Sequence, residues 1–202
     1  MKGRGDPLWS PITGENTHHV LRITHHVLLI THYETTRYAS HITILNKEVL
    51  TMSKKLKIAV IGAGSTYTPE LVDSFIKKYS EVSLEELYLM DIDSEKLSII
   101  EKLVRRMVCA GDVPVKIKSG TELSEALKGA DFVILQIRVE GLNARYRDET
   151  VPLEFGCIGQ ETTGAGGFSC ALRTIPAILH ICKIAEQYCP GAWIINFTNP
   201  SG

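Results

Sequence analysis

The segment from Lys57 to Pro69, KIAVIGAGSTYTP, constrains the fold of this chain more than any other. An apolar run ends in a Gly-x-Gly turn, and Thr68-Pro69 then begins a helix-forming segment. Glycines allow a tight turn and a close approach of the backbone to a ligand, and the first turn of a helix presents unpaired N–H groups. The segment therefore favours a dinucleotide with its phosphates at the turn, although Tyr67 replaces the third glycine of the GxGxxG pattern.

Beyond this turn the sequence alternates between strand and helix patterns. Strands are predicted at residues 58–61, 87–90, 115–118, 132–137 and 192–197, and helices after Pro69 and over residues 97–107, 121–127 and 171–188. The first strand is apolar at consecutive positions, which predicts burial on both faces. The repeated order predicts an α/β fold with a doubly wound, mostly parallel Rossmann-type sheet. Its strand ends bring Gly62, Asp91, Arg138 and Asn199 to one edge.

Asp91 ends the second predicted strand, about 24 residues beyond the glycine turn. An acidic residue at this point of a dinucleotide-binding fold bonds the hydroxyls of the adenosine ribose. Its charge would repel a 2′-phosphate, which favours NAD over NADP. The alternative interpretation is a helix-capping aspartate, a role that Asp93 before Ser94 could also fill.

Residues 138–167 are dense in charge and glycine and show little helical periodicity, which predicts a loop of about thirty residues. Its charged and amide side chains are Arg138, Arg145, Arg147, Asp148, Glu149, Gln160 and Glu161. Because arginine suits phosphate and carboxylate groups, the segment is a candidate substrate loop, with a solvated surface as the alternative. Asn199, after the last strand, could bond a nicotinamide ribose or a substrate hydroxyl, or simply form a turn with Pro200.

Composition excludes some classes of partner. The formal net charge of −1 gives no reason to expect nucleic acid or an anionic membrane, and no run reaches the roughly 18 apolar residues of a membrane helix. Five widely spaced cysteines, an odd number, favour free thiols in a reducing cytoplasm. None has a His or Cys nearby at metal-ligand spacing, and His180 is expected to pack within its helix. No complete metal site is therefore predicted after residue 51.

The first fifty residues differ from the rest of the chain. They contain six of the seven histidines and a seven-residue repeat, THHVLRI, THHVLLI, THYETTR. Paired imidazoles could bind zinc or nickel. We favour instead a non-native or disordered leader over residues 1–51, since the repeat lacks capping and turn signals. Residues 52–202 are then the dinucleotide-binding domain.

Several motifs together resemble the N-terminal part of glycoside hydrolase family 4. They are IGAGSTYTPEL, the strand-end aspartate, FVILQIR, VPLEFGCIGQETTGAGGFSCALR and INFTNPSG. GQETTGAGG and NFTNPSG are far more specific than the glycine turn, and the likeness covers the chain from Lys55 to Gly202. It is greatest to the family's 6-phospho-β-glucosidases, partly through the Thr-Thr-Gly at 162–164. The resemblance implies a sheet similar to that of lactate and malate dehydrogenases.

The resemblance also implies an unusual hydrolysis of 6-phospho-glycosides. Tightly bound NAD+ takes a hydride from C3 of the sugar, a tyrosine base removes the C2 proton, and a divalent metal, usually manganese, stabilises the developing charge. The aglycone leaves by elimination, water adds, and the hydride returns. The complete enzyme is expected to be a homo-oligomer.

Particular residues match family positions with known roles. The cofactor-binding positions are Gly62, Gly64, Ser65, Thr66, Asp91 and Arg138. The resemblance implies that Arg145 and Asn199 hold the phosphosugar. It also implies that Glu161, in GQET, raises the basicity of the catalytic tyrosine.

The family's metal-binding cysteine and histidine and its catalytic tyrosine are expected beyond residue 202. The C-terminal catalytic part is therefore expected to be missing, no metal ligand is predicted within this chain, and the chain alone is expected to be inactive. One alternative is an NAD-dependent 2-hydroxy-acid dehydrogenase, which is not expected to contain GQETTGAGG. The other is a non-catalytic NAD-binding module.

Overall fold

A computed structural model of the chain describes residues 55–198. The leader predicted over residues 1–51, and Asn199, lie outside the described residues. The elements follow in the order β1 (Leu56–Ile61), α3 (Thr68–Lys77), β2 (Leu84–Met90), α4 (Ser94–Ala110), β3 (Lys116–Gly120), α5 (Leu123–Leu127), β4 (Phe132–Leu135), α6 (Gly141–Glu154), α7 (Gly164–Tyr188) and β5 (Trp193–Asn196).

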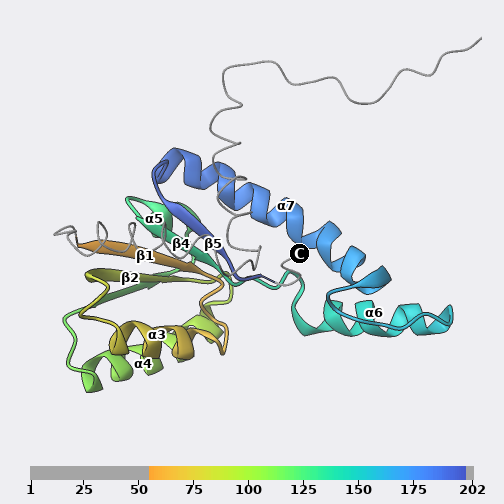
Figure 1. Ribbon diagram of the computed structural model, residues 1–202, viewed down its shortest axis with the longest axis horizontal. Helices are drawn as coiled ribbons and strands as arrows, with labels where there is room; N and C mark the ends of the chain where they lie inside the picture. The colour runs from red at the N-terminus through yellow and green to blue at the C-terminus, as the bar shows by residue number, and fades with distance from the viewer. Residues whose placement is uncertain (1–54, 199–202) are drawn as a thin grey trace, which may run out of the picture. The chain divides into compact units, whose positions relative to one another are not determined.

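The described strands form one parallel sheet in the order β3-β2-β1-β4-β5 (Figure 1). β1 lies at the centre, between β2 and β4. After β3 the chain crosses back past β1 to begin β4, so the direction of winding reverses between β1 and β4. The predicted doubly wound, parallel sheet is confirmed. In such folds ligands bind outside the carboxyl ends of the strands at this reversal, which is where the glycine turn lies.

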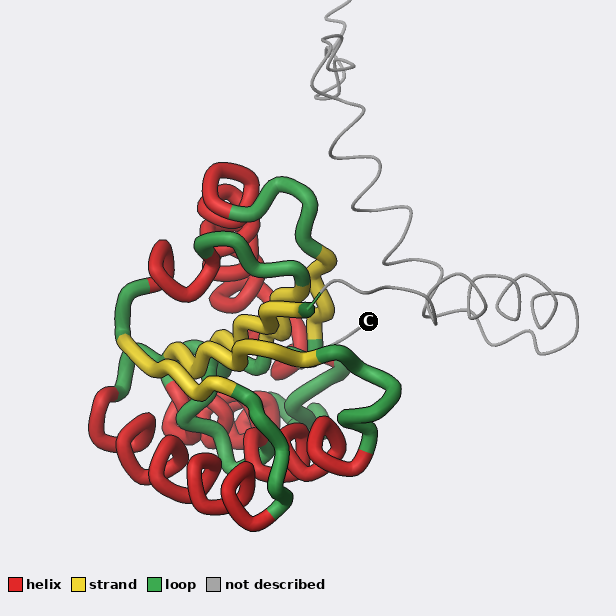
Figure 2. The backbone as a smooth tube through the Cα atoms, turned by 90° about the vertical axis from the view of Figure 1, so that its left-hand side faces the viewer, coloured by secondary structure: helices red, strands yellow, loops and turns green. Residues whose placement is uncertain are grey.

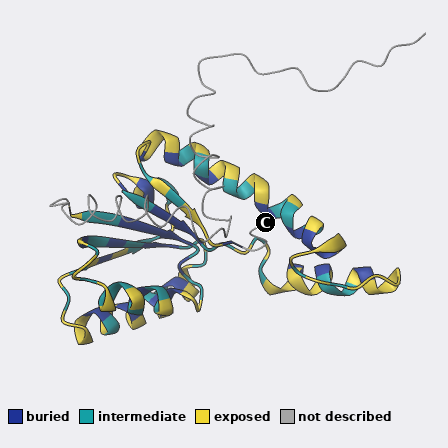
Figure 3. Cartoon of the chain, viewed as in Figure 1, coloured by how far each residue is buried: buried dark blue, intermediate teal, exposed yellow. Residues whose placement is uncertain are grey.

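Helices cover both faces of the sheet (Figures 1 and 2). Ile58 and Val60 of β1 pack in a core shared with α3 and α4, whereas Ala59 and Ile61 pack in a second core with α5 and the C-terminal half of α7. All four side chains are at most 4% exposed. The predicted burial of β1 on both faces is therefore confirmed, and Figure 3 shows the buried strands between the helices.

Local signals begin and end α3 and α4 where the sequence predicts. Pro69 lies in the first turn of α3, where its missing N–H costs no hydrogen bond. The Asp93 side chain caps α4 by accepting a hydrogen bond from the Lys96 N–H at 3.1 Å. Gly111 follows the last residue of α4, and its N–H donates to the Met107 carbonyl oxygen at 2.9 Å. These short-range contacts define the two helices independently of the sheet.

The loop predicted over residues 138–167 is wrong, because α6 occupies 14 of these residues and α7 begins at Gly164 rather than Ala171. The buried residues of α6 are Ala144, Asp148 and Pro152, which are spaced four apart but do not form an apolar pattern. One of the glycines that suggested a loop serves helix packing instead. A Cβ atom on Gly166 would lie 2.5 Å from the Asp148 carbonyl oxygen, so only glycine allows this approach of α7 to α6.

The two halves of α7 pack differently. Ile181 and Ala185 of the C-terminal half lie in the core on the sheet, and the N-terminal half packs against α6. The outward face is apolar and more than half exposed at Phe168, Leu172, Ile175 and Leu179. Among the described helices, α7 is the one whose length and composition would allow it to cross a membrane. Core helices of globular proteins can have the same length and composition, and the C-terminal half of α7 packs in the core on the sheet.

Candidate functional site at the carboxyl edge of the sheet

Two glycines shape the turn after β1 for different reasons. Gly62 has a φ of +89°, a left-handed conformation that is strained for other residues. At Gly64 the constraint is space, because a Cβ atom there would lie 2.8 Å from Oδ2 of Asp91. Ser65 and Thr66 complete the turn. The residues predicted to line dinucleotide phosphates therefore lie together at the carboxyl end of β1.

Most N–H groups of this turn already have acceptors. Those of Gly62 and Ala63 both donate to the Met90 carbonyl oxygen at 2.9 Å, which ties the turn to the end of β2. Within residues 55–198 the Thr66 N–H has no acceptor, and it immediately precedes the first turn of α3. Thr66 therefore offers an amide to a phosphate oxygen beside the positive end of the helix dipole.

Asp91 lies directly against the turn. Its Oδ2 accepts a hydrogen bond from the Gly64 N–H at 2.8 Å, and its Oδ1 accepts one from the Asp93 N–H at 2.9 Å. The capping alternative for Asp91 is wrong, because Asp93 caps α4. Half-buried at the end of β2, Asp91 has the position that ribose binding requires, and that role stays a prediction.

Tyr67 stands where the third glycine of the usual pattern would be. It has ordinary right-handed helical dihedral angles, with φ −77° and ψ −20°, so this position does not require glycine. Its exposed ring meets the ring of Phe197, beyond β5, edge to face at a centroid distance of 6.3 Å. The absent glycine therefore leaves the conformation of the turn intact.

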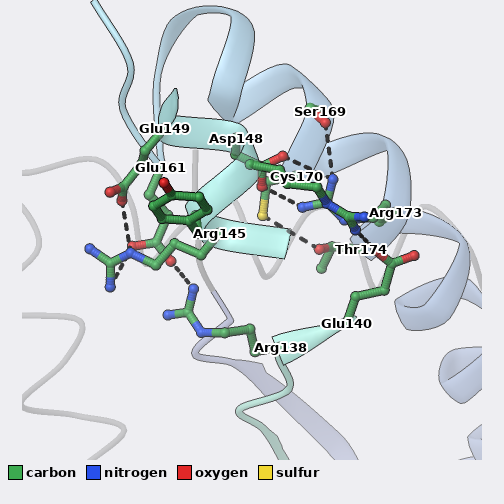
Figure 4. A network of polar contacts seen from close by, with 12 residues as sticks. Arg138, Glu140, Arg145, Asp148, Glu149, Glu161, Ser169, Cys170, Arg173 and Thr174 are labelled. Carbon is green, nitrogen blue, oxygen red and sulfur yellow. Dashed lines mark hydrogen bonds and ion pairs between the residues drawn. The ribbon is translucent and has the colours of Figure 1, made fainter. Parts of the chain in front are cut away.

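A charged cluster joins the end of β4, α6 and the segment before α7 (Figure 4). Glu161 forms ion pairs with Arg138 and with Arg145, the second at 3.3 Å between Nη1 of Arg145 and Oε2 of Glu161. Arg145 also donates to Glu149 at 2.8 Å, and its two carboxylate partners raise the pKa of its guanidinium. The structure thus brings Arg138, Arg145 and Glu161 together at the carboxyl edge of the sheet, a grouping that the sequence did not predict.

Other charges of the same segment have structural roles. Asp148 is buried between α6 and α7, where it pairs with Arg173, and Arg173 also donates a hydrogen bond to the Ser169 hydroxyl at 3.0 Å (Figure 4). The Arg173 guanidinium holds the pKa of Asp148 below its usual value, against the opposing effect of burial. Arg147 is exposed and pairs with Glu140 at 2.7 Å. Asp148 and Arg147 therefore do not extend the candidate substrate cluster.

Sequence reasoning missed several polar residues at this edge. The Gln136 side chain, just beyond β4, bonds Thr68 and the glycine turn. Thr198 is buried and its hydroxyl accepts a hydrogen bond from the Ile137 N–H at 3.2 Å, which joins the ends of β4 and β5. The available signal was a polar residue directly after an apolar strand, the same signal that selected Arg138.

Metal ligands do not converge in the described part of the chain. Between residues 55 and 198 no three His, Cys, Asp or Glu side chains are placed to hold an ion, and the five cysteines are free. The expectation that His180 packs within its helix is wrong, because it lies on the exposed side of α7. The described residues thus combine a dinucleotide-type turn with an arginine cluster.

The sequence of this region matches the model of family 4 glycosyl hydrolases over residues 57–202. The chain belongs to family 4 of the glycosyl hydrolases. It is 54% identical over 153 residues to a probable 6-phospho-beta-glucosidase of Bacillus subtilis (strain 168), which covers 75% of this chain and 35% of that protein. A 6-phospho-beta-glucosidase of Escherichia coli (strain K12) is 52% identical, with 75% and 34% covered. The chain therefore spans about a third of the length of these curated relatives.

Solved structures show the same relationship. The 6-phospho-beta glucosidase of Thermotoga maritima, solved with manganese, NAD+ and glucose-6-phosphate, superposes with a TM-score of 0.69 at 43% identity, covering 73% of this chain and 35% of that one. A lactate dehydrogenase from Eimeria maxima, solved with NADH and oxamate, gives 0.52 at 19% identity, covering 74% and 38%. That second likeness confirms the predicted dehydrogenase-like fold and carries no inference about activity.

Proposed function

We propose that this family 4 chain forms the dinucleotide-binding part of a 6-phospho-β-glucosidase. The whole enzyme would hydrolyse O-glycosidic bonds of 6-phospho-glycosides with NAD and a divalent metal, Mn2+, as cofactors. The observation that carries the proposal is that the glycine turn after β1 and the Arg138–Arg145–Glu161 cluster beyond the neighbouring strand β4 lie on the same edge of the sheet. The relatives that are more than half identical in sequence bear this enzyme name, which supports the β branch.

The turn residues fit a dinucleotide. Gly62 and Gly64 give close backbone access, and Ser65 offers a hydroxyl to phosphate oxygens. Thr66 offers them an amide that has no acceptor within residues 55–198, and Asp91 would accept hydrogen bonds from ribose hydroxyls. Arg138 would add positive charge on the side of β4. Bound NAD would supply a reversible hydride acceptor at the sugar.

The arginine cluster fits the phosphate of the sugar. Arg145 presents a planar guanidinium that suits bidentate contact with a phosphate, and its exposed surface faces solvent at the sheet edge. Asn199, from the family resemblance, would add a contact to the phosphosugar. Glu161 would orient the two arginines and raise the basicity of the tyrosine base. No ligand set for the metal lies within residues 55–198, so we assign no residue to it.

The competing functions have less support. A 2-hydroxy-acid dehydrogenase rests on shared fold alone, and a non-catalytic module has no observation in its favour. We also propose a cytoplasmic protein, consistent with its free cysteines, that acts on a small phosphosugar without nucleic acid or a membrane as partner. The complete enzyme would be a homo-oligomer.

Calorimetry with the 202-residue chain tests the proposal. We expect NAD+ to bind, and glucose 6-phosphate to bind the NAD+ complex through Arg145. Arg145→Gln should weaken the binding of glucose 6-phosphate about tenfold or more, because a charge-assisted contact with the phosphate is lost. Arg147→Gln is the matched control, since Arg147 lies on the same helix and pairs with exposed Glu140 rather than with the cluster. Equal loss in both variants, or no NAD+ binding by the unaltered chain, would reject the proposal.

A further inference from the structure

The side chain of Gln136 reaches from the end of β4 to the glycine turn. Its Nε2 donates to the Thr68 hydroxyl at 2.6 Å and to the Gly62 carbonyl oxygen at 3.2 Å. The Thr68 hydroxyl in turn donates to the Ala63 carbonyl oxygen at 2.8 Å, and Thr68 is completely buried. One amide thus holds two successive carbonyl groups of the turn, one directly and one through a threonine.

The chemistry of these partners fixes how the Gln136 amide must face. The Gly62 carbonyl oxygen can only accept hydrogen bonds, and the Thr68 hydroxyl already donates its proton to the Ala63 carbonyl oxygen. Both partners therefore require a donor, so the NH2 end of the amide points toward them. A side chain of similar length without donors at this position would leave the buried Thr68 oxygen without a donor.

The backbone brings Gln136 unusually close to the turn. A Cβ atom on Gly62 would lie 2.7 Å from the Gln136 carbonyl oxygen, and the Gln136 N–H donates to the Ile61 carbonyl oxygen at 2.9 Å. On the opposite side, Asp91 and the Met90 carbonyl oxygen hold the amides of the turn. The turn is thus held from β2 by its N–H groups and from β4 by its carbonyl groups.

This division has a consequence for an incoming phosphate. Carbonyl oxygens repel anions, and Gln136 and Thr68 keep those of Gly62 and Ala63 turned into the protein. The Thr66 N–H, which has no acceptor within the described residues, remains available to a phosphate oxygen. Rotating either held peptide would turn its carbonyl oxygen out of the protein, where it would repel an anion.

We propose that Gln136 is a positioning residue for the dinucleotide: it orients the phosphate-facing turn through Thr68 and does not itself touch the reacting atoms. This inference rests on the NAD-binding function proposed above. It predicts that the side chain of Gln136 contributes to affinity for ligands that contain a pyrophosphate and contributes little for ligands that lack one.

Gln136→Met tests this prediction without adding charge, since methionine is similar in length and has no amide. In the 202-residue chain we expect about tenfold weaker binding of NAD+ and ADP, and unchanged binding of adenosine measured by NMR titration. Gln187→Met is the matched control, because Gln187 is exposed on α7. Circular dichroism of each variant establishes that it is folded.

Thr68→Val supplies an independent second variant, because it removes the hydroxyl that relays the contact, and it carries the test if Gln136→Met does not fold. Thr68→Val should weaken the binding of NAD+ by a similar factor. The double variant should lose little more affinity for NAD+ than either single variant does. An affinity for NAD+ within twofold of the unaltered chain in both variants would overturn the inference, as would equal loss for adenosine. Absence of NAD+ binding by the unaltered chain would instead reject the proposed function, and this inference with it.

Discussion

At the scale of single residues, the carboxyl edge depends on a few positions where the backbone or a neighbouring group excludes other side chains. Gly62 has a left-handed backbone conformation, and the Gln136 carbonyl group lies so close to it that a Cβ atom would not fit. Asp91 joins the turn to the end of β2 by a hydrogen bond from Gly64. Substitutions at these two positions test the architecture and the chemistry separately.

Gly62→Ala should destabilise the chain by about 3 kcal/mol. The left-handed conformation is strained for alanine, and its Cβ atom would clash with the backbone beyond β4. Gly129→Ala is a matched control, since Gly129 also has a positive φ, +68°, but a Cβ atom there would meet nothing within 4 Å. It should cost only about 1 kcal/mol. Urea unfolding followed by circular dichroism measures both, and equal costs would contradict the steric part of the explanation.

Asp91→Asn should weaken the binding of NAD+ about tenfold and reduce the preference of the chain for NAD+ over NADP+. The asparagine keeps the size of the side chain but removes the charge that would bind ribose hydroxyls and repel a 2′-phosphate. Calorimetric titration with both dinucleotides measures the effect. Asp112→Asn, at an exposed position after α4, is the control and should change neither affinity. An unchanged preference in Asp91→Asn would remove Asp91 from the cofactor site.

At the scale of elements, α6 and α7 are joined by a buried ion pair where a hydrophobic core would be usual. Asp148 of α6 is 5% exposed, and Arg173 of α7 pairs with it. A buried carboxylate that loses its partner is costly, so this pair makes the packing of the two helices sensitive to single substitutions. Arg145 lies on α6, and Glu161 lies three residues before α7 begins at Gly164, so the packing of the two helices helps to position these two residues.

Arg173→Ala should therefore destabilise the chain by about 3 kcal/mol and increase amide hydrogen exchange across α6. Arg147→Ala removes the adjacent exposed pair and should cost no more than about 1 kcal/mol. Urea unfolding and hydrogen exchange with mass spectrometry measure the two effects. A loss in Arg173→Ala as small as that in the control would show that the pair does not hold the helices together.

The same pair makes part of the stability depend on pH. Because the pKa of Asp148 is lower in the folded chain than its usual value of 3.8, its ionised form stabilises the folded state above pH 3.8. This contribution is lost as the pH falls through the folded-state pKa. The difference in unfolding free energy between the unaltered chain and Asp148→Asn should be constant near neutral pH and shrink below pH 3.8. A difference that grows on acidification would contradict this assignment.

At the scale of the whole molecule, large apolar side chains are exposed on α7 and β5. Leu172 and Leu179 of α7 are 60% and 63% exposed, and Trp193 of β5 is 52% exposed. Large exposed apolar surfaces promote association. The 202-residue chain should therefore self-associate with increasing concentration, measured by sedimentation velocity. Replacing both leucines by glutamine should reduce this, whereas Ile99→Gln on α4 should not, and equal association in all three would contradict the role of α7.

Glycosidase activity also belongs to the whole molecule. No metal-binding group of side chains lies within residues 55–198, although the proposed chemistry requires a divalent ion. The purified 202-residue polypeptide should therefore release no p-nitrophenol from p-nitrophenyl 6-phospho-β-glucoside, with NAD+ and Mn2+ supplied. Measurable release above a no-enzyme control would overturn this prediction, while NAD+ binding without release is the expected result.

Much of the fold could be predicted from local patterns. The apolar run of β1, Pro69 at the start of α3 and the cap at Asp93 each act within a few residues, so the sequence shows them directly. The extent of β2 was less accessible, because its first residues include Glu85 and Glu86, whose partners Lys116 and Lys118 lie on the adjacent strand. Helix α6 was missed because its buried aspartate is matched by an arginine 25 residues later.

The sequence by itself determined the winding of the sheet and the gathering of Gly62, Asp91 and Arg138 near its carboxyl edge. These follow from periodicity and strand order, which are carried by neighbouring residues. Only the tertiary structure decided which charges meet, since Glu161 joins both arginines while Asp148 is taken by Arg173. It also decided that Gln136 supports the turn across 74 residues of sequence. Such contacts depend on distances between elements, and no local pattern encodes them.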